Sequence, residues 1–271
     1  MKIFKDKHIL QKEISKTKGI SFVPTMGGLH NGHISLIKRS KKSKLKTLVS
    51  IFVNPKQFNK KSDYRSYPIN TKKDLKKLKN LKIDYLYIPT IKDIYGFKPR
   101  EKVFLDKFSK KLCGRFRKGH FEGVLNVVNR FLEIIKPRYI FLGKKDYQQL
   151  YLIKKHIEKR NIKSKIIECK TIRENNGVAL STRNSNLDKN QIKIASNIYL
   201  YLRNLKKKIK KNYNFFNLNK IKKDLKDLGV RKIDYLENYN TKNFKKIKRQ
   251  NKKFNLFIAY YIKNVRLIDN I

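Results

Sequence analysis

The chain has no tryptophan and only two cysteines, Cys113 and Cys169, among its 271 residues. Two cysteines so far apart do not indicate a disulfide scaffold, and a reducing, cytoplasmic setting fits this composition best. No stretch reaches the roughly 18 consecutive apolar residues that a transmembrane helix needs, so we expect no membrane span. The first residues also lack the apolar core of a signal peptide, and no secretory leader is expected.

Acidic residues are scarce as well: 20 Asp and Glu stand against 69 Lys and Arg, a formal net charge of +49. Such a charge is typical of proteins that bind nucleic acid, which is one function class to consider. However, the lysines are spread along the chain and accompany abundant Asn, Ile, Tyr and Phe, which A/T-rich codons favour. The densest run, residues 206–211, is typical of a solvated helix face. We therefore expect weak binding that salt removes, and no specific nucleic-acid partner.

The most informative segment contains neither the Gly-x-x-x-x-Gly-Lys-Ser/Thr nor the Gly-x-Gly-x-x-Gly pattern. It reads Pro-Thr-Met-Gly-Gly-Leu-His-Asn-Gly-His at residues 24–33. The apolar run 19–23 before it predicts a buried strand, and the amphipathic run 34–40 after it predicts a helix. A strand-to-helix turn suits phosphate, because the backbone can approach the anion and the helix N-terminus favours negative charge. His-x-Gly-His at this place is typical of nucleotidyl transferases, which attack the α-phosphate of a nucleotide.

His30 and His33 lie three residues apart, so both imidazoles can face one pocket from the first helical turn. Each can donate a hydrogen bond where charge builds on phosphoryl oxygens, and either can be charged near neutral pH. Gly27, Gly28 and Gly32 leave room for a nucleotide against the main chain. The alternative interpretation is a structural turn that contains two histidines incidentally.

The first part of the chain alternates strand patterns with helix patterns. Apolar runs predict strands at residues 20–23, 47–53, 83–88, 139–142 and 166–168. The clearest helix pattern runs from Val124 to Ile135 with i, i+3, i+4, i+7 spacing, and Pro137 ends it. Apolar strands separated by helices predict an α/β fold with a parallel sheet covered on both faces. Ligands bind such sheets at the carboxyl ends of the strands.

The pattern changes near residue 171. Lys-rich helices are expected at 191–211 and 218–228, with a loop at 212–217 between them. Short strands are expected at 232–236 and 256–262. Helices followed by strands indicate a smaller α+β domain. We therefore expect two domains, residues 1–170 and residues 171–271.

Two polar segments follow other predicted strands. Asn54 and Gln57 carry amides that suit a small hydroxy-acid substrate, although Asn-Pro can also build a plain turn. Lys145 can contact phosphate as a point charge, and Asp146 can cap the next helix or contact a ribose. Gln149 lies one turn further on a similar face. A capped helix start with surface lysines is the alternative for this second segment.

Two further segments allow two interpretations each. Ser181, Thr182 and Arg183 place hydroxyls beside a guanidinium, which makes either a mobile phosphate clamp or a domain linker. The segment 119–123, Gly-His-Phe-Glu-Gly, opens the long helix. His120 in this segment either serves the site or has a capping or packing role.

Taken together, these segments resemble the pantothenate synthetase (pantoate–β-alanine ligase) family. The matching segments occur in the family's order over nearly the whole chain: residues 24–33, 49–58, 119–131, 143–150, 173–184 and 266–270. Each segment is modest alone, but the joint match is very specific. Another HxGH nucleotidyl transferase of cofactor biosynthesis is the alternative. The amide pair Gln57 and Gln149, together with an AMP product, would distinguish the two.

The resemblance implies a Rossmann-like parallel sheet of the HxGH nucleotidyl transferase type and a smaller C-terminal α+β domain that closes as a lid. It implies ATP-dependent condensation of (R)-pantoate with β-alanine to pantothenate. A pantoyl adenylate forms on the way, and pyrophosphate and AMP are released. It also implies Mg²⁺, without naming a protein ligand for it, and a cytoplasmic homodimer with no membrane partner. Because an adenylate hydrolyses in water, a closing domain has a purpose.

The resemblance also implies which residues form the site. His33 is the expected catalytic histidine, with His30, Lys145 and Arg183 acting beside it. The expected ATP-binding residues are Met26, Gly27, Gly28, Leu29, His30, Asn31, Gly32, His33, Gly143, Lys144, Lys145, Asp146, Ile172, Leu180, Ser181, Thr182 and Arg183. Ile172 is expected to reach the adenine through its backbone. Gln57 and Gln149 are expected to bind pantoate, with Gln57 near β-alanine and Asn54 in the same region.

Five positions depart from the family pattern. Lys144 stands where Glu is usual, Asn176 where Asp is usual and Thr182 where Ser is common. Cys113 stands in place of Glu, and Lys118 in place of Pro. Lys144 has the most direct bearing on the site, because it reverses a charge beside the ATP segment. We expect activity to be retained, since the principal groups survive.

Overall fold

The computed structural model describes residues 1–59, 61–65, 67–241, 243–249 and 253–271. The chain divides into two compact units, Met1–Ile172 and Arg173–Ile271, and each unit has its own sheet. Within the described residues, no helix combines the length and the apolar character that crossing a bilayer requires.

The first unit contains a six-stranded sheet. In spatial order its strands are β1 (Lys2–Phe4), β4 (Tyr85–Tyr87), β3 (Lys46–Ile51), β2 (Ile20–Thr25), β5 (Tyr139–Gly143) and β6 (Lys165–Cys169). Every neighbouring pair is parallel. The predicted α/β fold with a Rossmann-like parallel sheet is therefore confirmed. The short edge strand β1 was not among the predicted strands.

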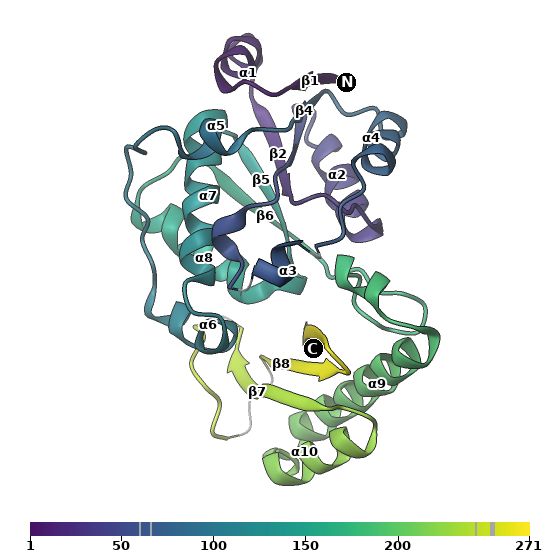
Figure 1. The fold of residues 1–271 in the computed structure, drawn as a ribbon. Coiled ribbons are helices and arrows are strands. Elements are labelled where there is room, and N and C mark those ends of the chain that lie inside the picture. The colour runs from purple at the N-terminus through teal and green to yellow at the C-terminus, as the bar shows by residue number, and fades with distance from the viewer. Residues whose placement is uncertain (60, 66, 242, 250–252) are drawn as a thin grey trace. The chain divides into compact units, whose positions relative to one another are not determined.

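Helices cover both faces of this sheet (Figure 1). The α-helices of the unit are α1 (Lys7–Ile14), α2 (Asn31–Lys41), α3 (Lys61–Arg65), α4 (Thr71–Asn80), α5 (Ile91–Tyr95), α6 (Cys113–Phe116), α7 (His120–Ile135) and α8 (Tyr147–Lys159). Its 3-10 helices are η1 (Pro55–Gln57), η2 (Lys107–Lys110) and η3 (Lys144–Asp146).

Successive residues of the central strand β2 serve the two faces. Val23 packs with Ile37 of α2 and Leu78 of α4, and all three are completely buried. Phe22 instead contacts the ring of Phe131 in α7, with centroids 5.4 Å apart. Because both faces of the strand are covered, its sequence is a continuous apolar run rather than an alternating one.

The second unit contains an antiparallel sheet in the order β7 (Lys232–Asn240), β8 (Phe254–Ile262) and β9 (Val265–Asn270). Its helices are α9 (Lys189–Lys211), α10 (Leu218–Asp227) and the 3-10 helices η4 (Thr182–Asn186) and η5 (Tyr213–Phe215). The predicted α+β domain is confirmed. The strands extend beyond their predicted ends, β9 was not predicted, and the expected loop 212–217 contains the turn η5.

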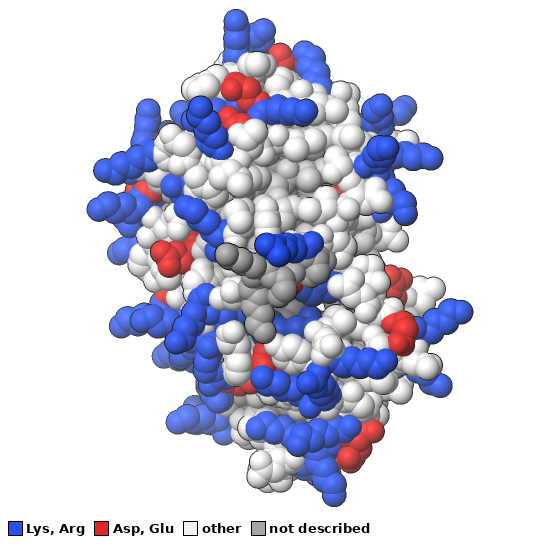
Figure 2. Space-filling view, in the orientation of Figure 1, with Lys and Arg blue, Asp and Glu red and all other residues white. Residues whose placement is uncertain are grey.

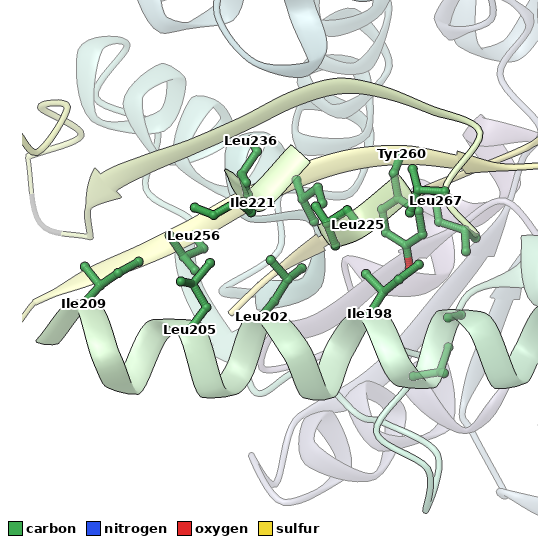
Figure 3. Close-up of a cluster of buried hydrophobic side chains, with 14 of the residues drawn as sticks. Ile198, Leu202, Leu205, Ile209, Ile221, Leu225, Leu236, Leu256, Tyr260 and Leu267 are labelled. Carbon is green, nitrogen blue, oxygen red and sulfur yellow. The ribbon is translucent and has the colours of Figure 1, made fainter. Parts of the chain in front are cut away.

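One face of α9 supplies much of the core of this unit. Ile198, Leu202, Leu205 and Ile209 point from the helix toward the strands (Figure 3). Their spacing of three and four residues is that of one helix face. Apart from Ile209, residues 206–211 are all lysines. All of these lysines except the half-buried Lys206 are exposed.

Basic side chains are spread over the visible surface of both units. Figure 2 shows Lys and Arg scattered across this face, with acidic residues few and isolated among them. Among the described residues, the basic side chains on this face form no single patch, as the spread of lysines along the sequence indicates.

Candidate active site

Three of the singled-out segments meet at one edge of the parallel sheet. Residues 26–33 follow β2, residues 52–58 follow β3, and η3 follows β5. These strands are adjacent and parallel, in the order β3-β2-β5, so their carboxyl ends share one edge. That edge is where open α/β sheets bind ligands. The structure therefore brings His30 and His33 together with the Gln57 and Lys145 segments.

The turn after β2 is held in shape by α4. Gly27 and Gly28 have φ angles of +83° and +61°, in the left-handed region that favours glycine. Asp74 in the first turn of α4 is buried, and its carboxylate accepts hydrogen bonds from the Gly28 and Leu29 amides, both at 2.8 Å. Lys77, one turn later, donates to the Leu29 carbonyl.

Sequence reasoning did not find Asp74 or Lys77. The signal that could have found Asp74 is its position four residues before the buried Leu78, on the apolar face of α4. An acidic residue on a core-facing position requires buried hydrogen-bond donors, because an unpaired charge there is costly.

The two histidines begin α2, and the His30 backbone amide donates a hydrogen bond to the His33 ring. His30 is the N-cap of α2, and its Nδ1 accepts a hydrogen bond from the Gly32 amide at 3.1 Å. The His33 Nδ1 accepts one from the His30 amide at 3.3 Å, and the ring centroids lie 4.1 Å apart. Because both Nδ1 atoms are acceptors, each neutral ring carries its proton on Nε2. The pair therefore presents two Nε2–H donors.

Burial keeps both rings uncharged. It lowers the pKa of His30 to about 4, with the charge of Lys145 adding to the effect. It lowers the pKa of His33 to about 3, with His30 adding to the effect. The expectation that either imidazole can be charged near neutral pH is therefore wrong for the protein without ligand. Both act as neutral hydrogen-bond donors.

The segment after β5 carries two lysines with different partners: Lys145 lies at the site, and Lys144 pairs with a carboxylate of β6. The Lys145 side chain is 19% exposed and pairs with Asp146 at 3.2 Å. Of the two roles considered for Asp146, capping is wrong, because its side chain makes no cap hydrogen bond to α8. Lys144 forms an ion pair with Glu168 of β6 at 3.1 Å. The charge reversal at position 144 is thus partly offset by a neighbouring strand.

The segment 119–123 supports the backbone of Gln57. His120 is buried, and its Nδ1 donates to the Gln57 carbonyl at 2.8 Å, while its Nε2 lies 3.0 Å from Arg117 Nη1. A Cβ at Gly123 would lie 2.2 Å from the Lys56 carbonyl oxygen, so η1 packs directly on α7 at this glycine. His120 therefore holds the backbone of Gln57, which favours the packing role over a catalytic one.

The glutamine pair on α8 divides into a buried and a partly exposed member. Gln148 is buried, donates to the Phe108 and Lys111 carbonyls at 2.9 and 2.8 Å, and accepts from the Cys113 amide at 3.1 Å. Gln148 thus anchors the segment before α7. Gln149 is only half-buried at the start of α8. Its expected contact with pantoate remains a prediction.

The remaining expected phosphate ligands lie in the second unit. Ser181 Oγ accepts a hydrogen bond from the Arg183 amide at 3.3 Å and so begins η4. The start of this segment is fixed by Arg173, which pairs bidentately with Asp269 at 2.6 and 2.8 Å. The matching segment 266–270 therefore holds the loop that carries Arg183. Contact of residues 180–183 with ATP remains a prediction, as does that of Ile172.

Comparison with known proteins identifies the family. A family model described as pantoate-beta-alanine ligase matches residues 2–271. Pantothenate synthetases from Francisella tularensis subsp. mediasiatica and Francisella philomiragia are each 41% identical over 265 residues, which is 97% of this chain and 93% of each relative.

Solved structures give the same result. The crystal structure of pantoate-beta-alanine ligase from Francisella tularensis, complexed with beta-gamma ATP and beta-alanine, is 38% identical. It has a TM-score of 0.85 and is covered over 97% of its length, with this chain covered completely. The pantothenate synthetase structure from Thermus thermophilus is 29% identical with a TM-score of 0.91, covering 100% of this chain and 99% of the other.

Proposed function

The chain belongs to the pantoate-β-alanine ligase family and forms pantothenate from pantoate and β-alanine, and we propose that it does so through a pantoyl adenylate made from ATP. The observation that supports this route best is the meeting of His30, His33, Gln57 and Lys145 at the carboxyl edge of β3, β2 and β5. This arrangement puts groups that can bind phosphate next to an amide that suits a hydroxy acid.

In the first step, a carboxylate oxygen of pantoate attacks the α-phosphorus of ATP, and the bond to pyrophosphate breaks. Charge grows on the α-phosphoryl oxygens and on the leaving pyrophosphate, so donors that are already in place lower the barrier. The Nε2–H groups of His30 and His33 supply neutral donors, and Lys145 supplies a positive charge. No protein nucleophile is needed, and both cysteines are buried.

Pantoate must be aligned with the α-phosphate, which is a positioning task. We assign it to the amides of Gln57 and Gln149. The Gln57 backbone is held by His120 and its side chain by Asn54, at 2.8 and 3.2 Å, so this amide is fixed before substrate arrives.

In the second step, the amine of β-alanine attacks the acyl carbon of the adenylate. The acyl C–O bond breaks, AMP leaves with the former pantoate oxygen, and the amine loses a proton. Ser181, Thr182 and Arg183 are proposed to close over the phosphates so that water does not reach the adenylate. A homodimer in the cytoplasm is proposed from the family resemblance.

Mg²⁺ is proposed as a companion of the nucleotide. Within the described residues, no group of three or more His, Cys, Asp and Glu side chains could hold a metal ion. Mg²⁺ commonly binds through substrate phosphates and only one or two carboxylates of the protein. A site with a single carboxylate therefore suits an ion that arrives with ATP. Asp146, whose side chain is 48% exposed and whose charge acts on both histidines, is the carboxylate that we assign to it. The ion would neutralise phosphate charge.

The test follows one oxygen atom. Pantoate labelled with ¹⁸O in its carboxylate is incubated with ATP and β-alanine, and the AMP is analysed by mass spectrometry. The adenylate route transfers one labelled oxygen to AMP. AMP release should require β-alanine, whereas pyrophosphate should form from ATP and pantoate alone in the first turnover. His33→Ala is expected to lower kcat about 100- to 1000-fold, as the loss of one transition-state donor does.

His8→Ala is the matched control, because His8 is an exposed histidine on α1. It should leave kcat unchanged. Unlabelled AMP, or ADP in its place, would exclude the adenylate route. Adenylylation of another cofactor precursor in preference to pantoate would favour the second candidate, a different HxGH transferase, but the amide at Gln57 and the family membership favour the ligase.

A further inference from the structure

Tyr95, at the end of α5, touches the site through Asn54. Its hydroxyl donates a hydrogen bond to Asn54 Oδ1 at 2.7 Å. Asn54 N-caps η1 and is 1% exposed. Tyr95 lies in none of the segments that carry the family resemblance, and sequence reasoning gave it no role.

Two backbone groups determine how the Asn54 amide is oriented. The Lys56 amide donates to Oδ1 at 3.2 Å, and the Gly123 carbonyl accepts from Nδ2 at 3.0 Å. Since a backbone amide only donates and a backbone carbonyl only accepts, Oδ1 and Nδ2 are assigned without ambiguity. The Tyr95 hydroxyl must then be the donor to Oδ1.

The same logic extends to Gln57. The second Nδ2 hydrogen of Asn54 points to Gln57 Oε1 at 3.2 Å, so Oε1 is the acceptor and Nε2 is the end that remains. Gln57 Nε2 lies against the sulfur of Met26, a weak partner, in the turn that leads to the histidines. The N–H end of the Gln57 side chain therefore faces the turn that leads to the histidines, with one hydrogen on the weak Met26 acceptor.

All four hydrogen-bonding positions of the Asn54 amide are thus occupied inside the protein. Oδ1 accepts from Tyr95 and Lys56, and Nδ2 donates to Gly123 and Gln57. A substrate would have to break one of these bonds to reach Asn54. This geometry favours an indirect role for Asn54 over the direct contact expected from the sequence.

We propose that Tyr95 is a positioning residue for the ligase reaction, which acts through Asn54 to hold the Gln57 amide with its N–H end toward pantoate. The inference rests on the proposed placement of pantoate at Gln57. An N–H end suits pantoate, because the carboxylate and the hydroxyl oxygens of this acid all accept hydrogen bonds.

The surroundings of Tyr95 keep its hydroxyl a donor. Burial raises the pKa of Tyr95 to about 12, so the phenol stays protonated at working pH. The Lys56 ammonium lies 4.0 Å from the ring centroid and the Arg130 guanidinium 5.0 Å from it. These cation–π contacts restrain the ring beside Asn54.

The experiment is a double-mutant cycle between Tyr95→Phe and Gln57→Ala, with KM and kcat measured separately for pantoate and ATP. In the wild-type background, Tyr95→Phe should lower kcat/KM for pantoate about five- to tenfold, the effect of one lost hydrogen bond. KM for ATP should not change. In the Gln57→Ala background, Tyr95→Phe should have no further effect, because the residue through which it acts is gone.

Tyr139→Phe is the matched control, since Tyr139 is half-buried at the opposite end of the sheet, at the start of β5. It should leave all kinetic constants unchanged. Equal losses from Tyr95→Phe in both backgrounds would show a merely structural role and overturn the proposal. Wild-type kinetics for Gln57→Ala alone would overturn both this proposal and the placement of pantoate. If Gln57→Ala lowers kcat/KM for pantoate but Tyr95→Phe has wild-type kinetics, only the role of Tyr95 would be overturned.

Discussion

At Gly123, helix α7 approaches η1 so closely that one added methyl group tests the architecture of the pantoate region. A Cβ there would lie 2.2 Å from the Lys56 carbonyl oxygen, 2.6 Å from its carbon and 2.9 Å from Gln57 Cα. All three atoms are backbone, so no side chain can turn aside. Ordinary contact begins at 3.4 Å, and η1 must therefore retreat by about 1.2 Å in Gly123→Ala.

Two opposing free energies decide the effect on stability. Alanine is favoured over glycine inside a helix by about 1 kcal/mol. Overpacking costs about 1–3 kcal/mol in a core, and rigid backbone puts this contact at the upper end. We therefore expect Gly123→Ala to lower the free energy of unfolding by about 1–2 kcal/mol, the balance of these two terms.

The effect on catalysis should be larger, because Gln57 moves with η1. A displacement of about 1 Å at a positioning group can cost about 100-fold in rate. Steady-state kinetics should show this loss in kcat/KM for pantoate, with KM for ATP little changed. Thermal unfolding measured in parallel separates the two effects.

Glu122→Ala is the matched control, since Glu122 precedes Gly123 in the same helix and is exposed. It should retain full activity and near wild-type stability. A Gly123→Ala protein that is more stable than the wild type and fully active would refute the packing of η1 on α7. A Gly123→Ala protein that is destabilised as expected but fully active would refute the assignment of Gln57 to pantoate.

Two further predictions concern charge. Burial lowers the pKa of His156 to about 4, as it does for His30, and it lowers the pKa of His33 further. Histidines that are neutral in the folded protein take up protons on unfolding below pH 6.5. The free energy of unfolding should therefore be at its full value above pH 6.5 and fall as the pH drops toward 4. For the completely buried His156 the loss is on the order of 3 kcal/mol. Urea unfolding between pH 8 and pH 5 should show this fall, and His156→Gln should reduce it; a flat profile would contradict the burial of these rings. Lys144→Glu would place a carboxylate beside Glu168, so we expect a loss of about 1 kcal/mol that salt reduces, with KM for ATP within about twofold; a large change in ATP binding would show that Lys144 faces the nucleotide.

Most of the parallel sheet could be predicted because its strands are buried on both faces. Their continuous apolar runs, such as 20–23 and 139–142, stand out from the Lys-rich helices between them. The strands β1 and β9 were missed for the opposite reason. β1 has three residues, and β9 carries Arg266 and Asp269, so neither forms an apolar run.

The meeting of the site segments could also be predicted, since parallel neighbouring strands place their carboxyl ends at one edge. The contacts that hold those segments could not. Sequence reasoning assigned Asp74 and Tyr95 no role, and for His120 it allowed a packing role without naming Gln57 as the partner. Each of the three acts on a segment far away in the chain, through a contact that only the packing of α4, α5 and α7 creates. A motif predicts which groups perform chemistry, but it carries no signal for what orients them.

Lys144 shows how far a sequence pattern can mislead about electrostatics. Read along the chain, it reverses a charge in the ATP segment, next to Lys145. In the sheet, β6 pairs with β5 so that Glu168 lies opposite Leu142, just before η3. The Lys144 ammonium meets that carboxylate at 3.1 Å, and Lys154 lies 4.0 Å from its other oxygen, so Glu168 offsets part of the added charge within the first unit. The charge of a site depends on residues from neighbouring strands, so a reversed charge in a motif alters the site only where the adjoining strand offers no counter-charge.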